Sequence, residues 1–462
     1  MLHERQKQEA KLGFVKLILL ILNTACFGVA WMAWYSHRLY NTGFNGKGNL
    51  LVVALFAVLY GLFATLYGGF KVEINRTSEV IYSQTISLFI TDCIAYIIIW
   101  LLSRQLPNVL PLLGSFAAGF LLSTIWAKLA NKAANKILPA KRTLLIYDNA
   151  EAYRNGREII ERLPWRFALQ NEISVDSDEQ DIGWICDEIG KSGAEAVMLC
   201  GLRSSQRNTI LKYCVDKDIR AYVRPNIGDF MMYSATVMQM ANLPVFVCQR
   251  STPNVIYTAS KRVFDIILAL IALVIASPFM LVTAIAIKAY DGGPVLYKQE
   301  RLTKDGKRFN VLKFRSMKVD AEKDGVARLA SEHDDRITPV GKIIRACRID
   351  ELPQIFCILN GSMSCVGPRP ERPEIASKYE EQMPEFALRL QAKAGLTGYA
   401  QVYGKYNTEP YDKLQMDLMY IAKQSFATDF KIILATIKIL FMPESTEGIS
   451  EGQTTAMSGE SN

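Results

Sequence analysis

The sequence is poor in the residues that build metal centres and disulfide frameworks. Its 462 residues include only three histidines, and the nine cysteines form neither a CxxC pair nor a cluster with histidine. This pattern argues against a structural zinc site. The odd, scattered set of cysteines is instead typical of free thiols in a reducing compartment.

The sequence also carries no RNA- or DNA-binding signature, so we expect no nucleic-acid partner. Its formal net charge of +8 then favours anionic lipid or a phosphorylated substrate as the partner, because long apolar segments accompany the charge. The length predicts two to four domains. The composition separates them, since the first 130 residues are mostly apolar and the rest are mixed.

A glycine-rich phosphate loop is missing from the middle of the chain. Residues 142–250 alternate strand-like and helical pieces, which predicts an α/β domain with a parallel sheet. A dinucleotide-binding unit would carry GxGxxG after its first strand, but Asp148, Asn149 and Ala150 stand there. Because a backbone without glycine cannot closely approach a pyrophosphate, we expect a degenerate, structural or regulatory module over 140–250.

Four apolar stretches dominate residues 1–130, and each has roughly the 17–25 residues that a helix needs to cross a bilayer. They run over about 13–35, 50–70, 84–103 and 109–127. Cations gather before the first, after the second and after the fourth stretch. The positive-inside rule therefore places the N-terminus and everything after residue 128 in the cytoplasm. The first stretch lacks a clear cleavage site and continues through Trp31 and Trp34, which predicts an uncleaved anchor.

A fifth apolar stretch, 263–290, contains Ser277 and Pro278 at its middle. The part before the proline would be about 21 Å long at 1.5 Å per residue, shorter than the hydrocarbon core of roughly 30 Å. A helix that breaks at the proline and returns to its entry face fits these lengths. A proline-kinked spanning helix is also tolerated in membranes, and geometry leaves both open.

Residues 296–401 then combine charge, glycine and proline, with the adjacent carboxylates Asp350 and Glu351 at their centre. The preceding segment 336–349 predicts a basic amphipathic helix suited to a membrane surface. We expect Asp350 to cap a new helix that continues through Pro353. An acidic pair at a helix start is commonly structural and stabilises the helix dipole by about 0.3–1 kcal/mol.

The same position has a chemical consequence. The helix end and nearby arginines would keep Asp350 ionised, and an ionised carboxylate can attack phosphorus to form an acyl phosphate. Surrounding cations could neutralise a diphosphate, and Asp350 could also ligate Mg²⁺, which carboxylates bind. These cations are Lys313, Arg315, Arg345, Arg369 and Arg372. His333, in a polar loop, is a weak candidate for a general base.

A series of motifs resembles the bacterial sugar transferase family, the monotopic phosphoglycosyl transferases, over about 256–442. The motifs are KRVFD at 261–265, GPVLYKQER at 293–301, FNVLKFRSM at 309–317, RIDELPQ at 348–354, MSCVGPRPE at 363–371 and GLTGYAQV at 395–402. The preceding helices and α/β segment resemble the long form of the family, the polyprenyl-phosphate hexose-1-phosphate transferases. The resemblance implies a membrane protein of class α plus α/β, with four transmembrane helices, a Rossmann-like module and a mainly helical catalytic domain.

The resemblance also implies a reaction. With Mg²⁺, Asp350 would attack the sugar-linked phosphate of a UDP-sugar and expel UMP, and undecaprenyl phosphate would then take the phosphosugar from Asp350. Glu351 matches the partner of the nucleophile, and Lys313, Arg345 and Asp429 match further positions tied to activity. The helix with Ser277 and Pro278 would be re-entrant in the lipid bilayer of the bacterial inner membrane, with the catalytic domain cytoplasmic.

Further expectations are a possible homodimer, a disordered tail over 443–462, and a looser turn at Ala394, where the family's KPGLTG has proline. The sugar is left open among glucose, galactose and N-acetylated sugars. Two other hypotheses remain: a membrane regulator that senses ligand through the α/β segment, and a conventional glycosyltransferase that would release UDP. The product would be the first lipid-linked intermediate of an exopolysaccharide, capsule or O-antigen.

Overall fold

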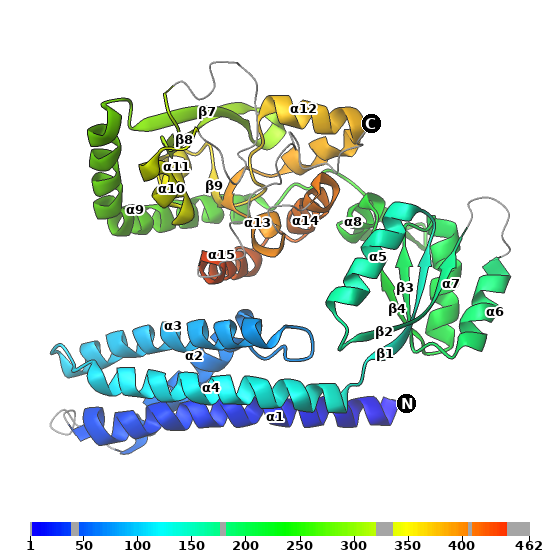
Figure 1. The fold of residues 1–462 in the computed structure, drawn as a ribbon, viewed down its shortest axis with the longest axis horizontal. Helices are drawn as coiled ribbons and strands as arrows, with labels where there is room; N and C mark the ends of the chain where they lie inside the picture. Colours follow the sequence, from blue (N-terminus) through cyan, green and yellow to red (C-terminus); the bar gives the residue numbers. More distant parts are fainter. Residues whose placement is uncertain (1, 38–45, 176–181, 320–335, 405–408, 441–462) are drawn as a thin grey trace. The chain divides into compact units, whose positions relative to one another are not determined.

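The structure is a computed structural model that describes most of the chain. The described residues are 2–37, 46–175, 182–319, 336–404 and 409–440. They divide between two compact units, residues 1–226 and 227–462 (Figure 1). His333 and the tail 443–462 lie outside the described residues.

Four long helices form where the N-terminal apolar stretches predict them. They are α1 Leu2–Ala30, continued by the π-helical turn η1 Trp31–Tyr35, then α2 Gly46–Leu66, α3 Thr77–Ser103 and α4 Leu110–Ile137. Together with α9 of the second unit, these are the five helices in the described part of the chain that are long and apolar enough to cross a membrane.

The four-helix bundle is apolar outside and hydrogen-bonded inside. Large side chains such as Leu50 and Leu101 are exposed on its surface. Inside, Asn23 Nδ2 donates to the Tyr60 hydroxyl (2.7 Å), which donates to Gln84 Oε1 (2.7 Å). Buried polar groups must pair within the protein when lipid surrounds it, so this distribution is typical of a membrane protein.

A four-stranded parallel sheet completes the first unit. Its strands are β1 Lys141–Tyr147, β2 Phe167–Ser174, β3 Ala196–Cys200 and β4 Arg220–Val223, in the order β2-β1-β3-β4. The helices between them are α5 Ala150–Arg162, α6 Ile182–Ser192 and α7 Ser204–Asp216. Asn149 follows β1 and caps α5 through its Oδ1, which accepts from Ala152 N (2.8 Å). The predicted parallel α/β domain is confirmed.

This domain ends earlier than the expected residue 250. The second unit begins at Ile227 with α8 Ile227–Tyr233 and the antiparallel hairpin of β5 Thr236–Met240 and β6 Leu243–Val247. Ile227 and Phe230 pack against the core of the second unit. The boundary differs because these apolar residues bury in that core rather than against the parallel sheet.

The fifth apolar stretch forms one helix, α9 Val255–Asp291, with Pro278 inside it. Figure 1 shows that α9 turns a corner along its length rather than running straight. Ala269 and Ala276 pack in one core with Ile355, whereas Ile287 packs in another with Ile344. The helix therefore bends without being interrupted, and both of its ends contact the same unit. Its return to one membrane face stays a prediction.

The rest of the second unit is mainly helical, as expected. A hairpin of β7 Leu296–Leu302 and β8 Arg308–Phe314 follows α9, joined by the 3₁₀ turn η3 Lys304–Gly306. The remaining elements are α10 Pro339–Ala346, η4 Ile349–Glu351, α11 Gln354–Leu359, β9 Ser364–Val366, α12 Pro373–Gln382, η5 Pro384–Gln391, β10 Gly395–Thr397, α13 Tyr399–Tyr403, α14 Pro410–Ala422 and α15 Phe426–Leu440.

The short parallel strands β9 and β10 hold the start of the GPRPE segment, residues 367–371. A Cβ on Gly367 would lie 2.1 Å from the Lys393 carbonyl oxygen, so only glycine allows this approach. Gly367 N donates to Thr397 O (2.8 Å). Ala394 is buried, and its N–H donates to Thr303 Oγ1 (3.1 Å). The expected looser turn is therefore wrong, because alanine keeps a donor that proline would lack.

Candidate active site

Asp350 lies in a tight 3₁₀ turn between two helices rather than at a helix cap. α10 ends at Ala346, and Arg348 then adopts the left-handed conformation (φ 54°), which reverses the chain into η4. Pro353 takes the cap position of α11. The expected capping role of Asp350 is wrong because this extra turn separates it from the helix.

The helix before this turn is also shorter than the expected 336–349. Thr338 starts it by accepting from Gly341 N through Oγ1 (2.9 Å). Ile344 is buried, but Ile343 is 67% exposed and Cys347 is exposed as well. Only part of the predicted apolar face therefore packs into the unit, and Ile343 and Cys347 stay on its surface.

Glu351 is held by two cations from different segments. Lys313 Nζ, from β8, lies 3.1 Å from Glu351 Oε1, and Arg369 Nη2, from the GPRPE segment, lies 2.8 Å from the same oxygen. The Glu351 side chain is 18% exposed. Burial favours its neutral form, but Arg369 and Lys313 outweigh burial and lower the pKa of Glu351 well below its usual range. Glu351 is therefore a fixed anion.

The side chain of Asp350, unlike that of Glu351, is not engaged by a neighbouring cation among the described residues. Within the part of the chain that the structure describes, no hydrogen bond or ion pair engages the Asp350 side chain. Burial and the neighbouring charge of Glu351 raise its pKa, whereas Lys313, Arg345 and Arg369 act in the opposite direction. The cations thus offset burial only in part, and the ionisation of Asp350 at neutral pH stays a prediction.

The remaining cations near the site come from α10, from β7 and from the position just after the GPRPE segment. Arg345 is half-buried at the end of α10 and contributes its charge at Asp350. Arg372 precedes α12. Burial, with the charges of Arg369 and Arg372, lowers the pKa of Arg301 to about 10, against the opposing effect of Glu371. Arg301, Arg345 and Arg369 therefore each interact electrostatically with the carboxylate pair, and Arg301 is one that sequence reasoning missed.

Arg315, predicted for this site, has structural partners instead. Its guanidinium pairs with both carboxylate oxygens of Asp291 at the end of α9, and its Nε donates to Pro294 O (2.7 Å). Its side chain is buried. These contacts tie β8 to the end of α9, so the donors of Arg315 are already used.

Asp429 lies in a second buried network, at the start of α9. Its Oδ2 accepts from Lys261 Nζ (2.7 Å) and from the Tyr257 hydroxyl (2.9 Å), and its Oδ1 accepts from Tyr420 (2.9 Å). One turn along α9, Asp265 accepts from Ser364 Oγ (2.7 Å). These contacts fix α15 and β9 to α9. A role of Asp429 in activity stays a prediction.

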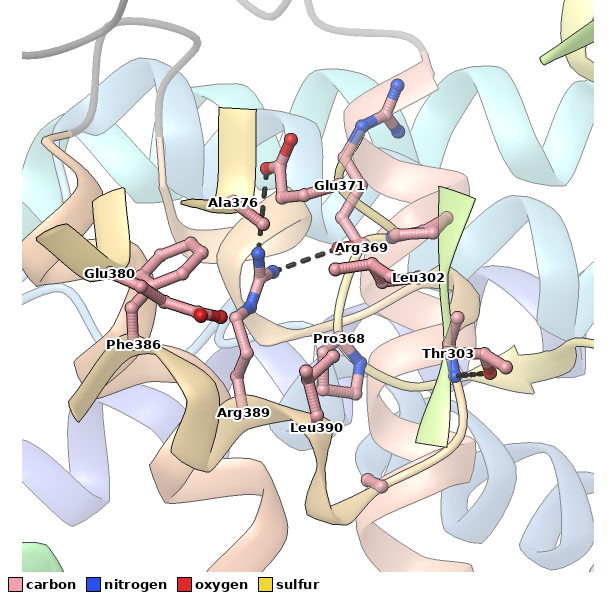
Figure 2. Close-up of a pocket in the computed structure, with 13 residues that line it drawn as sticks. Leu302, Thr303, Pro368, Arg369, Glu371, Ala376, Glu380, Phe386, Arg389 and Leu390 are labelled. Atoms are coloured by element: carbon pink, nitrogen blue, oxygen red, sulfur yellow. Dashed lines mark hydrogen bonds and ion pairs between the residues drawn. The ribbon is translucent and has the colours of Figure 1, made fainter. Parts of the chain in front are cut away.

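A small pocket lies behind the GPRPE segment. Figure 2 shows Arg389 at its centre, pointing at Glu371 and at the main chain of Arg369, with Phe386 beside it. Arg389 and its partner Asp417 were missed from the sequence. No local pattern marks them, because they meet only when η5 and α14 pack together.

The arrangement of Asp350 and Glu351 fits a Mg²⁺ ion that binds together with the phosphates of a substrate. Among the described residues, no three His, Cys, Asp or Glu side chains come together as metal ligands. Mg²⁺ commonly binds through one or two carboxylates plus substrate phosphates. Asp350, which has no partner within the described segments, fits that mode, whereas Glu351 is already paired.

The fold and site together define a class: a membrane-associated domain whose cations surround a half-buried carboxylate. Comparison with known proteins narrows it, because residues 256–443 match the model of the family described as "Bacterial sugar transferase". The chain is 40% identical over 188 residues to an "Exopolysaccharide production protein PSS" of Rhizobium leguminosarum bv. phaseoli, covering 38% of this chain and 92% of that protein. The chain therefore belongs to the bacterial sugar transferase family.

Two longer relatives show the same similarity. A "UDP-N-acetylgalactosamine-undecaprenyl-phosphate N-acetylgalactosaminephosphotransferase" of Aeromonas hydrophila is 40% identical over 191 residues, 41% of this chain and 45% of the relative. A "UDP-glucose:undecaprenyl-phosphate glucose-1-phosphate transferase" of Klebsiella pneumoniae is 38% identical over 218 residues, 46% and 47% of the two chains. The chain thus spans about half the length of these relatives.

Proposed function

We propose that this protein transfers a hexose-1-phosphate from a UDP-sugar to undecaprenyl phosphate, the first step in building an exopolysaccharide, capsule or O-antigen. The proposal rests on one observation: of two adjacent carboxylates, one is held by cations and the other is not. Glu351 is fixed between Lys313 and Arg369, while Asp350 beside it has no partner among the described residues. Family membership and the names of the relatives support the same reaction.

In the first half-reaction, an Asp350 carboxylate oxygen attacks the sugar-linked phosphorus of the donor. The bond from that phosphorus to the bridging oxygen breaks, and UMP leaves with the electron pair. In the second, a phosphate oxygen of undecaprenyl phosphate attacks the same phosphorus and releases Asp350. Covalent catalysis of this kind replaces one difficult step with two easier ones.

The cations of the site stabilise charge as it develops. Lys313, Arg345 and Arg369 face the carboxylate pair from three different segments, so they can surround a diphosphate without moving first. Preorganised charge of this kind is a large part of phosphoryl-transfer catalysis. Mg²⁺, held by Asp350 and donor phosphates, would neutralise further phosphate charge.

The location follows from the acceptor. The exposed apolar side chains of α9 would lie in the inner-membrane bilayer, where undecaprenyl phosphate resides, and those of α10 would touch it. UDP-sugars are cytoplasmic, so the catalytic unit would face the cytoplasm, with α9 re-entrant at Pro278.

The test is the identity of the nucleotide released. Purified protein with Mg²⁺, undecaprenyl phosphate and a panel of UDP-sugars should release UMP and form a lipid-linked diphosphosugar with one donor. Asp350→Asn should abolish this release, because an amide cannot form the acyl phosphate, and Asp305→Asn, an exposed change in the same unit, should leave it unchanged. Release of UDP, or full activity in Asp350→Asn, would refute the proposal.

A further inference from the structure

The GPRPE segment is held from behind by two arginines. Arg301 Nη1 donates to Pro370 O (2.9 Å), and Arg389 Nη2 donates to Arg369 O (2.9 Å). Both arginines also approach Glu371, at 3.8 and 3.6 Å. Consecutive carbonyls of the segment are thus fixed, and the side chain of Arg369 projects from this fixed backbone to Glu351.

Arg389 makes the more buried of these contacts. It is 3% exposed. Its Nε donates to Asp417 Oδ2 (2.8 Å), and its guanidinium carbon lies 4.8 Å from the centre of the Phe386 ring. Figure 2 shows the Arg389 guanidinium between Glu371 and the main chain of Arg369. Arg389 therefore joins α14, η5 and the GPRPE segment through one planar group.

Stability alone does not explain why Arg389 and Asp417 form a buried ion pair. Desolvation of both charges offsets most of their attraction, so a well-packed apolar pair of similar volume would stabilise the fold as well. Burial raises the pKa of Asp417 to about 6 even though Arg389 opposes the shift. What an apolar pair could not supply is the directed hydrogen bond to the Arg369 carbonyl, whose place the planar guanidinium determines.

We propose that Arg389 and Asp417 are a positioning pair for the reaction, holding the backbone of Arg369 so that its guanidinium meets Glu351 beside Asp350. This inference rests on the proposed function. Arg389 touches no reacting atom and acts only through Arg369. Misplacing a charged group by about 1 Å can lower a rate about 100-fold, so the pair has a measurable effect at a distance.

A double-mutant cycle tests the inference. Arg389→Met should lower kcat for UMP release about 10- to 100-fold, and so should Arg369→Met. The double variant should be no slower than Arg369→Met alone, because the positioned group is then already absent. If Arg389→Met lowers kcat by the same factor in both backgrounds, its role is structural and the inference is wrong.

Three further measurements keep the result interpretable. Arg250→Met removes an exposed cation of the same unit that pairs with Asp305, and should leave kcat unchanged. If Arg389→Met does not fold, Arg389→Lys replaces it, since lysine keeps the charge but cannot reach both partners in one plane. If the wild-type protein releases no UMP, the proposed function fails. The double-mutant cycle is then measured on the affinity for the UDP-sugar, and an equal effect of Arg389→Met in both backgrounds again shows a structural role.

Discussion

Replacing Lys313 with methionine should slow UMP release and also move its pH dependence. Methionine keeps the length and apolar stem of lysine but removes the charge. Lys313 Nζ lies 3.1 Å from Glu351 Oε1, and the two side chains are only 22% and 18% exposed. A charge-assisted hydrogen bond of this kind contributes about 1.5–3 kcal/mol, which corresponds to a loss of about 10- to 150-fold in kcat.

The pH dependence follows from the charge at Asp350. Burial raises the pKa of Asp350, and Lys313 is one of the cations that lower it again. Attack requires the ionised carboxylate, so activity falls as the pH drops through this pKa. Without Lys313 the pKa rises further, and the acid limb of the kcat profile should move to higher pH.

The assay is UMP release at saturating donor over a range of pH, with a control on the same hairpin. Arg308 lies on β8 like Lys313, but it is 65% exposed and its partner Glu300 is 47% exposed. Such surface pairs contribute about 0–1 kcal/mol, so Arg308→Met should change neither the rate nor the pH profile. If Lys313→Met matches the wild type in both, the electrostatic account of the site is wrong.

Three other changes test the fold that positions the site, each measured by thermal unfolding in detergent. Gly367→Ala places a methyl group 2.1 Å from a backbone oxygen and should destabilise the protein by about 1–3 kcal/mol, whereas Gly228→Ala, in open space, should not lower the unfolding temperature. Ala394→Pro removes the hydrogen bond to Thr303 and should lower stability by about 0.5–1.5 kcal/mol; an unchanged midpoint would show that this donor is unimportant. Asp429→Asn removes the nearer of the two carboxylates that face Lys261, leaving Asp265 at 3.9 Å, and should destabilise by about 1.5–3 kcal/mol; a stable variant would contradict the role of that network.

Sequence periodicity was sufficient for the parts of the fold that depend on local pattern. The apolar stretches became long helices because length and composition alone determine that outcome. The parallel sheet followed from alternating strand and helix signals. The density of cations around Asp350 also indicated the site, and Lys313 and Arg369 do meet Glu351.

Long-range packing decided what the sequence could not show. Arg315 belongs with Asp291 rather than with the site, and Arg389 belongs with Asp417, 28 positions away. Neither pairing has a local signature, because each forms only when distant elements meet. The position of Asp350 was missed for a different reason, since a single left-handed residue, Arg348, inserts a turn that helix propensities do not predict.

The contacts of α9 with the rest of its unit have a practical consequence for anyone purifying this protein. Its start is bound through Lys261 to Asp429, its middle supplies Ala269 and Ala276 to the interior, and its end is bound through Asp291 to Arg315. A water-soluble fragment made by trimming this helix would lose contacts at all three levels and should not fold. Crystallisation or inhibitor screening will therefore need a lipid mimetic from the first purification step.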